Sequence, residues 1–367
     1  MTDAALPPVP VATTQPRRSR ALLVLAVLAT LYTLYFARGF LMPIAFAILL
    51  DFLLSPAVRT LVKLRVPQVV AAGLVVLSLL AGGGFGVYQL AAPVQTWVSR
   101  APAAIETARE ELGKLLRPFE RVKKTAEQVE HAAAVNPDAS KPPVVVVQGP
   151  SIISRVFGST QRFLAGLLEV VILLFFLLSA GDLFLRKLIK VLPHLQDKLK
   201  AVRIAREVEL AISTYLVTIA GINLAEGLVF AGAMKLLGMP SPLLWGALVA
   251  TLEFIPYLGA LSIVVILTVA GLGSYEGVAR ALLIPGSFLL INTLQVNLIS
   301  PQLVGHRLAL NPVAVFIGLA FWFWLWGIPG AFIGVPMLAA FKICCDHIEM
   351  LAPVGEFLGG KDEPTVP

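Results

Sequence analysis

The chain has 367 residues, of which 57% are hydrophobic and only 14% charged, and its formal net charge is +7. Soluble domains carry about 25% charged residues, and a mean hydropathy of +0.85 excludes a water-soluble globular enzyme, a disordered chain and a fibrous protein. The basic residues form short clusters beside apolar segments, a pattern typical of membrane orientation and not of nucleic-acid binding. The composition therefore predicts an all-α polytopic membrane protein that binds no nucleic acid.

The N-terminal region opens with a tail rich in Pro, Thr and Ala, residues 1–20, which we expect to be disordered and cytoplasmic. Two apolar runs follow, Ala21–Ala37 and Phe40–Leu54, and only Arg38 and Gly39 separate them, so they predict a tight hairpin. A third run, Val69–Ala92, reaches the about 20 residues that a membrane crossing needs. Residues 21–92 are therefore predicted to be a group of transmembrane helices.

The third run contains a glycine-rich stretch, Gly82–Gly86. No Gly-Lys-Ser or Gly-Lys-Thr follows it and no strand pattern precedes it, which argues against a phosphate-binding loop. Small residues let two membrane helices approach closely. We therefore expect this stretch to pack against a neighbouring helix.

Residues 93–150 differ from the apolar runs because they hold 15 charged residues of nearly balanced sign. Their apolar residues recur at steps of three and four, which predicts an amphipathic helix: Ile105, Leu112, Leu115, Leu116, Phe119, Val122, Ala126 and Val129. Asn136 and Pro137 should end this helix, and Val144–Val147 is a short β-like run. We interpret the segment as a small helical insert outside the membrane.

A fourth apolar run, Phe163–Ala180, predicts a transmembrane helix within residues 151–180. The basic segment that follows, residues 181–207, carries seven Lys and Arg against three Asp and Glu. Because Lys and Arg accumulate on the cytoplasmic side of membrane helices, this segment, residues 55–67 and the N-terminus are predicted to be cytoplasmic. The insert then lies on the extracytoplasmic side.

Residues 208–349 are apolar but less regular. A segment at Leu210–Met234 is followed by apolar segments that are interrupted at Pro256, at Pro285 and between the runs Val313–Ile328 and Ala331–Cys345. Broken helices at membrane depth are tolerated where they are buried in protein or line a cavity, and they often mark substrate sites in secondary transporters.

The total is about six to eight transmembrane segments. Residues 242–272 and 313–345 are each either a re-entrant hairpin or a pair of full spans. Either alternative for the last pair leaves the tail, residues 350–367, in the cytoplasm.

Eight polar side chains lie inside apolar segments: Asp51, Glu169, Asn223, Glu226, Glu253, Asn292, Gln295 and Asn297. A charge at the bilayer centre costs about 3 kcal/mol, so these side chains should face protein or water. Asn223 and Glu226 are one helical turn apart and share a face, which suits either an interhelical hydrogen-bond pair or a binding site. Glu253 precedes Pro256 by three residues, where a carboxylate beside freed backbone carbonyls can hold a proton or a cation.

Signatures of enzymes are missing from the chain, which has no His-Glu-x-x-His helix, no Gly-x-Ser-x-Gly elbow and no Walker A loop. The histidines are scattered over loops and ends: His131, His194, His306 and His347. Cys344 and Cys345 are adjacent, so we expect neither a disulfide between them nor a metal site. The sequence predicts a protein that is not an enzyme and uses no cofactor or metal.

An ordered set of short motifs fills the C-terminal half. They are Leu236–Gly246 (LLGMPSPLLWG), Glu253–Gly259 (EFIPYLG), Ser300–Arg307 (SPQLVGHR), Leu310–Val313 (LNPV), Trp326–Gly330 and Gly334–Pro336, with Phe175–Arg186 upstream. Over about residues 20–358 the chain thereby resembles the autoinducer-2 exporter family, the PerM-like permeases of bacterial inner membranes.

The resemblance implies a multi-pass inner-membrane transporter with an external helical insert, assembled as a homo-oligomer, by resemblance a pentamer. It also implies export of autoinducer-2 or, for some members, sodium–proton exchange. The chain departs from the family where relatives carry a glutamate at Gln295, an arginine at His306 and Tyr-Leu-Arg-Gly-Gln at Tyr215–Ile219. These missing charges argue against ion coupling at those positions.

Three functions are compatible with these features. The first is a secondary transporter that exports a small polar solute by alternating access, and its expected pathway residues are Glu253, Pro256, Tyr257, Gln295, Asn297, Pro301, Asn223 and Glu226. The second is a sodium–proton antiporter in which Glu226 and Glu253 titrate. The third is a membrane scaffold whose external insert binds a partner. The expected partners are the lipid bilayer, a small polar solute or monovalent cation, and further copies of the chain.

Overall fold

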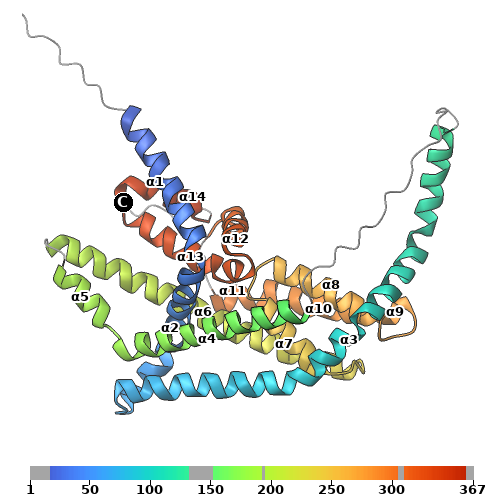
Figure 1. Ribbon diagram of the computed structural model, residues 1–367, viewed down its shortest axis with the longest axis horizontal. Coiled ribbons are helices and arrows are strands. Elements are labelled where there is room, and N and C mark those ends of the chain that lie inside the picture. The colour runs from blue at the N-terminus through green and yellow to red at the C-terminus, as the bar shows by residue number, and fades with distance from the viewer. Residues whose placement is uncertain (1–16, 132–151, 192–194, 305–309, 361–367) are drawn as a thin grey trace, which may run out of the picture.

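The computed structural model describes residues 17–131, 152–191, 195–304 and 310–360. These residues form helices joined by turns, and the one extended pairing among them is an isolated antiparallel bridge between Leu310 and Gly359. The first half contains α1 (Arg17–Phe36), α2 (Arg38–Lys63), α3 (Gln68–His131), α4 (Ile152–Ala180), α5 (Leu183–Val191) and α6 (Leu195–Leu236) (Figure 1). The second half contains α7 (Pro242–Leu252), α8 (Leu258–Leu272), α9 (Val278–Ala281), α10 (Leu283–Leu294), the π-helical turn η1 (Gln295–Ile299), α11 (Ser300–Val304), α12 (Pro312–Trp326), α13 (Ile328–Asp346), the 3₁₀ turn η2 (Glu349–Leu351) and α14 (Ala352–Leu358).

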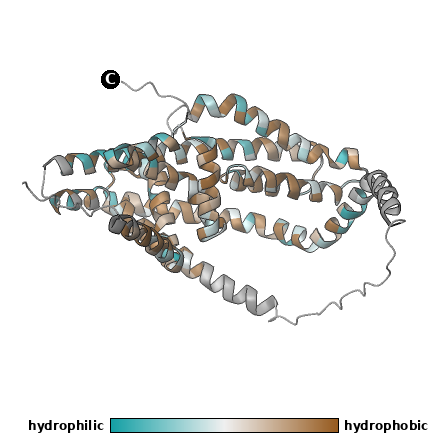
Figure 2. Cartoon of the chain, turned by 90° about the horizontal axis from the view of Figure 1, so that it is seen from above, coloured by the Kyte–Doolittle hydropathy of each residue, from teal (hydrophilic) through white to brown (hydrophobic). Residues whose placement is uncertain are grey.

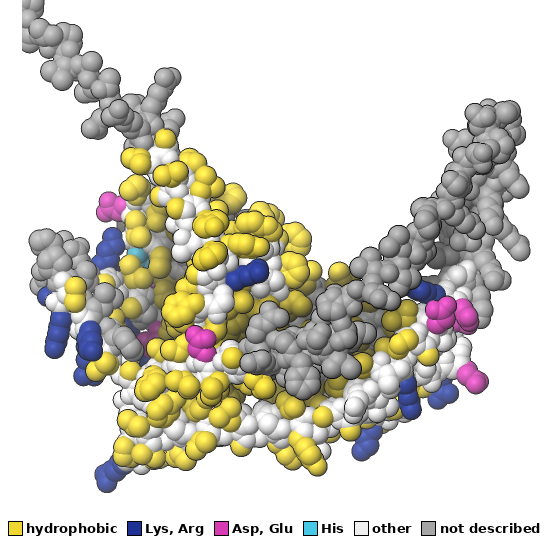
Figure 3. All heavy atoms as spheres, in the orientation of Figure 1, with side chains coloured by type: hydrophobic (Ala, Val, Ile, Leu, Met, Phe, Trp, Pro, Cys, Tyr) yellow, Lys and Arg dark blue, Asp and Glu magenta, His cyan; other side chains and the backbone are white. Residues whose placement is uncertain are grey.

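Five helical stretches in the described residues are long and apolar enough to cross a membrane: Arg38–Lys63, Gln68–Glu111, Lys198–Leu236, Val278–Leu303 and Ile328–Asp346. A sixth is added if α4 and α5 form one span with a bend of 61°. Hydrophobic residues extend along most of these helices in Figure 2, and in Figure 3 they cover the middle of the visible face. An apolar exterior is expected where lipid surrounds the helices. The prediction of an all-α, multi-pass membrane protein is confirmed.

The third predicted span and the amphipathic helix behind it form one continuous helix, α3, of 64 residues. At 1.5 Å per residue this helix is about 96 Å long, about three times the thickness of a hydrocarbon core. Its C-terminal part projects away from the bundle (Figure 1). The expected helix end at Asn136 and Pro137 and the β-like run Val144–Val147 lie outside the described residues.

The glycine-rich stretch Gly82–Gly86 does not pack as predicted. A Cβ atom added at any of its four glycines would meet nothing within 4 Å in the described part of the chain, so the expected close packing is wrong within one copy. A close approach occurs instead between α6 and α7, where a Cβ added at Gly227 would lie 2.5 Å from the Gly246 carbonyl oxygen. A single glycine in each helix is sufficient for this crossing, which is why composition did not reveal it.

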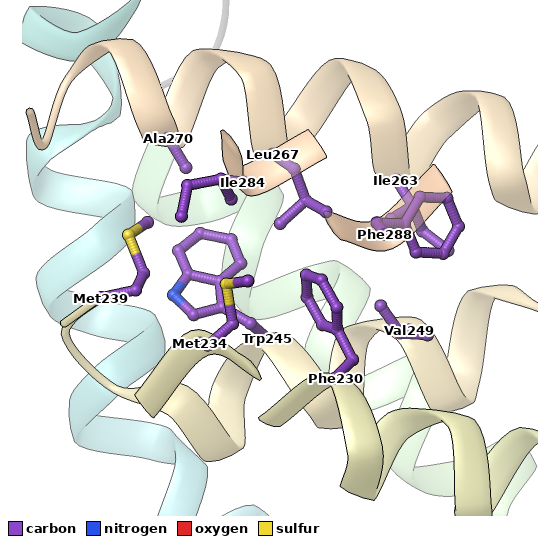
Figure 4. Close-up of a cluster of buried hydrophobic side chains, with 10 residues drawn as sticks. All are labelled: Phe230, Met234, Met239, Trp245, Val249, Ile263, Leu267, Ala270, Ile284 and Phe288. Atoms are coloured by element: carbon purple, nitrogen blue, oxygen red, sulfur yellow. The ribbon is translucent and has the colours of Figure 1, made fainter. Parts of the chain in front are cut away.

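A cluster of buried hydrophobic side chains joins α6, α7, α8 and α10: Phe230, Met234, Met239, Trp245, Val249, Ile263, Leu267, Ala270, Ile284 and Phe288 (Figure 4). The Trp245 indole lies beside Met234 and Met239 (Figure 4), and its Nε1 donates a hydrogen bond of 3.0 Å to the Pro240 carbonyl. The rings of Phe230 and Phe288 meet edge to face with centroids 6.0 Å apart. This core holds α7 and α8 against α6.

The interrupted segment 242–272 consists of two short helices joined by a turn. With 11 residues in α7 and 15 in α8, each is shorter than the about 20 residues that a full crossing needs. In the segment 313–345, α12 has 15 residues and is also short, whereas α13 has 19 and is long enough to cross. Gly327 joins α12 to α13 with φ of 68°, a conformation that favours glycine.

The predicted interruption at Pro285 is confined to one residue. Only Leu282 falls between α9 and α10, and the apolar helix otherwise continues from Val278 to Leu303. Pro285 is the third residue of α10. In the first turn of a helix the backbone N–H that proline lacks has no intrahelical partner, so proline is tolerated there.

Candidate functional site

Polar side chains from three parts of the chain gather inside the apolar bundle. They come from α6, from the turn between α7 and α8, and from α10 to α11, and we refer to them as the polar cluster: Asn223, Glu226, Glu253, Asn292, Gln295 and Ser300. Asn223 and Glu226 are only 3% and 4% exposed. Polar groups buried to this degree are normally hydrogen-bonded. A buried polar atom without a partner therefore marks a position where a proton or a ligand can bind.

Two carboxylates of the polar cluster share one amide. Asn292 Nδ2 donates a hydrogen bond of 3.3 Å to Glu226 Oε1, and the same amide lies beside Glu253, which also feels the charge of Glu226. Glu226 Oε2 and Glu253 Oε1 are buried without a hydrogen-bond partner. No described Lys, Arg or His forms an ion pair with either carboxylate. Each therefore has a free lone-pair position for a proton or a ligand.

The turn between α7 and α8 is tied to α6 by Asn223. With its amide oriented to suit its neighbours, Asn223 accepts a hydrogen bond of 3.2 Å from the Phe254 backbone N–H and donates one of 3.3 Å to the Ile219 carbonyl. The turn satisfies one of its freed backbone groups in this way, as irregular backbone at membrane depth requires.

Tyr257 holds the turn in a strained conformation. Its φ is 63° and ψ −53°, and the Leu258 N–H donates a hydrogen bond of 2.7 Å to the Pro256 carbonyl across it. This is the geometry of the γ-turn that is rare for a residue with a side chain. Strain of this kind costs about 1–3 kcal/mol and is concentrated at functional sites and switch regions.

A π-helical turn positions the next part of the polar cluster. In η1 the Ser300 N–H donates to the Gln295 carbonyl five residues earlier, and Gln295 Nε2 donates a hydrogen bond of 2.9 Å to Ser300 Oγ. Pro301 follows directly and cannot donate a backbone hydrogen bond. π-Helical turns are frequent at functional sites.

A groove of about 540 Å³ lies between α6 and the stretch from α10 to α11. Its lining is apolar apart from Thr218, Glu226 and Gln295. Glu226 and Gln295 of the polar cluster thus lie at the wall of an open cavity, whereas the half-buried Glu253 does not line it.

The predicted pathway residues do not all meet. Asn223, Glu226, Glu253 and Gln295 belong to the polar cluster, and Pro256 lies half-buried in the strained turn. Asn297 is exposed and donates to the Thr293 carbonyl of its own helix at 2.8 Å. Pro301 is exposed, and Tyr257 is 55% exposed, with its ring against that of Phe316 at a centroid distance of 6.5 Å.

Two members of the polar cluster were not among the predicted pathway residues. Asn292 precedes Gln295 by three residues, so helical spacing places both on one face of α10 and η1; this signal was present in the sequence. Ser300 carried no such signal, because its hydroxyl reaches Gln295 only through the π-helical turn.

A second, charged cleft of about 860 Å³ lies between α2, α4, α5 and α6 and includes Asp51. Arg59 of α2 forms an ion pair with Glu209 of α6. Arg206 bridges to Asp182 at 2.8 Å and to Glu209 at 3.2 Å. These pairs connect α2 and α6 to the bend between α4 and α5.

The described residues contain no group of three or more His, Cys, Asp or Glu that could hold a metal ion. The chemistry available to the polar cluster is therefore that of carboxylates, amides and one hydroxyl. Such a set can hold a proton, accept hydrogen bonds from a solute or pair with a cation.

Comparison with known proteins agrees with this architecture. The model of the family described as "AI-2E family transporter" matches residues 24–350. The chain is 23% identical over 312 residues to the AI-2 transport protein TqsA of Escherichia coli K12, covering 85% of this chain and 87% of TqsA. It is 25% identical over 334 residues to YhhT of the same organism, covering 90% and 91%, and 28% identical over 314 residues to MT0215 of Mycobacterium tuberculosis, covering 82% and 81%. The resemblance that the motifs predicted is confirmed, and the chain belongs to the AI-2E transporter family.

Proposed function

We propose that this membrane transporter exports a small polar solute across the bacterial inner membrane by alternating access. The observation that carries the proposal is the polar cluster, in which the buried Glu226 and the half-buried Glu253 each have one buried oxygen atom without a partner, beside a break in the helices. Polar groups at such a break within an apolar bundle are typical of solute sites in secondary transporters. The name of the relative TqsA makes autoinducer-2 the first solute to test.

The orientation that we propose follows from the basic residues. They concentrate around Arg59 and along residues 181–207, which favours a cytoplasmic position for the charged cleft, the N-terminus and the C-terminus. The cleft is then the inner entrance. Its ion pairs between Arg59 and Glu209 and between Arg206 and Asp182 hold α2, α6 and the bend after α4 together in the described conformation.

The mechanism requires an element with two arrangements. We assign this role to the turn at Tyr257. Relaxation of its strained backbone lowers the free energy, and the turn lies between Glu253 and α8. Loading of the carboxylates with a proton or a solute changes the charge beside the turn. Loading of the carboxylates and rearrangement of the turn are thereby coupled.

Uptake of labelled autoinducer-2 into inverted membrane vesicles tests the proposal, with vesicles that lack the protein as the control. We expect uptake that requires the protein and rises when a pH gradient is imposed. Equal uptake with and without the protein, under both conditions, would rule out autoinducer-2 as the solute.

The shared amide between Glu226 and Glu253 favours cation–proton antiport as a second candidate function. No described residue neutralises these two carboxylates, so they repel each other. Binding of either a proton or a monovalent cation relieves that repulsion, and one can therefore replace the other more readily than at a single carboxylate. Vesicles loaded with a pH-sensitive dye should then acidify or alkalinise when sodium is added. Absence of sodium-dependent proton movement in active protein would remove this candidate.

A further inference from the structure

The groove between α6 and α10–α11 combines apolar walls with a buried carboxylate. Its walls are formed by hydrophobic side chains from both sides: Val217, Ile222 and Val229 from α6, and Ile291, Leu294, Ile299 and Leu303 from α10 to α11. Glu226 and Gln295 reach the groove although they are only 4% and 8% exposed. The volume of about 540 Å³ lies within the range of sites for small molecules.

Small residues of α6 create the hollow. Gly221 and Ala225 lie one turn apart and both line the groove; Glu226 directly follows Ala225, and Val229 lies one turn further along. A Cβ added at Gly221 would meet nothing within 4 Å. A ligand can therefore approach the backbone of α6 beside the Glu226 carboxylate.

The Glu226 carboxylate lacks a partner of opposite charge. Asn292 satisfies Oε1, but Oε2 is buried without a hydrogen bond, and no described Lys, Arg or His forms an ion pair with it. Removing a carboxylate from water without a counter-charge costs several kcal/mol. A ligand with one positively charged donor would supply the missing partner.

The lining decides between classes of ligand. A metal ion that has lost its water needs about six oxygen ligands from the protein, and a polyol buries hydroxyl groups that must each be hydrogen-bonded. Three polar side chains cannot satisfy either. An apolar body gains free energy from the hydrophobic walls, and a single ammonium forms a charge-assisted hydrogen bond with the carboxylate.

We propose that this groove binds an amphiphilic ammonium, an apolar molecule with one protonated amine that donates to the carboxylate of Glu226. The proposal goes beyond the transport function and does not depend on it, because binding is measurable on protein that moves nothing. It also predicts that the groove itself rejects anions and polyols, so that a polar solute would bind on the Glu253 side of the polar cluster.

Three probes with the same rigid body test the proposal: 1-aminoadamantane, 1-adamantanol and 1-adamantanecarboxylate. Saturable binding is measured by equilibrium dialysis on the purified full-length chain in lipid nanodiscs, with empty nanodiscs subtracted. The amine should bind about tenfold or more tightly than the alcohol, because a hydrogen bond to a charged group is worth more than a neutral one. The carboxylate should not bind saturably.

Two variants locate the binding. Glu226→Gln keeps the size of the side chain and should abolish the difference between amine and alcohol. Gly221→Leu fills the hollow and should abolish binding of both. Gly232→Leu is the matched control on the same helix, because Gly232 does not line the groove and a Cβ there also meets nothing within 4 Å; it should bind as the original chain does.

Two results would overturn the proposal. Equal affinity of amine and alcohol for the original chain would show that the Glu226 side chain does not select for a protonated amine. Absence of saturable binding by all three probes, together with a change of oligomeric state in Gly221→Leu and not in Gly232→Leu, would identify the groove as a contact between copies of the chain. Size-exclusion chromatography of each variant reads the oligomeric state and verifies that the protein is folded.

Discussion

Gly227→Ala should lower the free energy of unfolding by about 1–3 kcal/mol, the cost of forcing an extra methyl group into a packed interface. The added Cβ would lie 2.5 Å from the Gly246 carbonyl oxygen and 2.8 Å from the Ala250 Cβ. A backbone oxygen and an alanine Cβ cannot move away as a long flexible side chain could, so α6 and α7 must separate. Separation would also shift Glu253 away from Glu226, because the turn that carries Glu253 follows α7 directly.

Gly232→Ala provides the matched control with the opposite sign. Gly232 lies on the same helix, and a Cβ there meets nothing within 4 Å. Alanine should therefore stabilise the protein by about 0.5–1 kcal/mol, the usual gain when glycine is replaced inside a helix. Thermal unfolding of the purified variants, followed by size-exclusion chromatography with fluorescence detection after heating, measures both changes. Two shifts of the same sign would contradict the close crossing of α6 and α7.

Glu253→Gln should reduce transport about tenfold or more, equivalent to about 1.4 kcal/mol, without reducing the amount of protein in the membrane. Glutamine has nearly the same size and keeps one oxygen atom that can accept a hydrogen bond. It cannot carry a proton or a negative charge, so the coupling between Glu253 and Glu226 is lost while the packing of the turn is retained. Initial rates of solute uptake in inverted vesicles, normalised to protein by immunoblot, measure the effect.

Glu276→Gln is the control for this substitution. Glu276 is exposed in the turn between α8 and α9, outside the polar cluster, so the same loss of charge should leave the initial rate unchanged. If Glu253→Gln transports at the original rate, Glu253 has no part in the mechanism. A fall in both variants would instead point to the overall charge of the chain and not to the polar cluster.

The pairing of Glu226 with Glu253 illustrates what sequence patterns can and cannot predict. Helical spacing placed Asn223 and Glu226 on one face, and the structure agrees, because the spacing is a property of one helix. The electrostatic interaction between Glu226 and Glu253 joins residues 27 positions apart. It depends on the glycine crossing of α6 and α7, for which neither hydropathy nor spacing contains a signal.

The packing of the glycines and the position of Asn297 were not visible in the sequence pattern. The glycine stretch in α3 was expected to pack closely and lies open, whereas single glycines in α6 and α7 form the crossing. Asn297 was expected to line the solute pathway with Gln295, and in the structure it is exposed and donates a hydrogen bond to the Thr293 carbonyl of its own helix. The run of glycines thus pointed to the right residue type for close packing but to the wrong helix.

The sequence by itself determined that this protein lies in a membrane, which of its segments are apolar helices, and which polar residues lie within those segments. These properties follow from hydropathy and helical spacing, which are read residue by residue. The tertiary structure alone decided which polar groups meet, which oxygen atoms remain without a partner and where a cavity opens. Within a membrane all apolar faces are nearly equivalent, so helices select their neighbours by close shape fit and by hydrogen bonds, and those depend on backbone geometry in three dimensions.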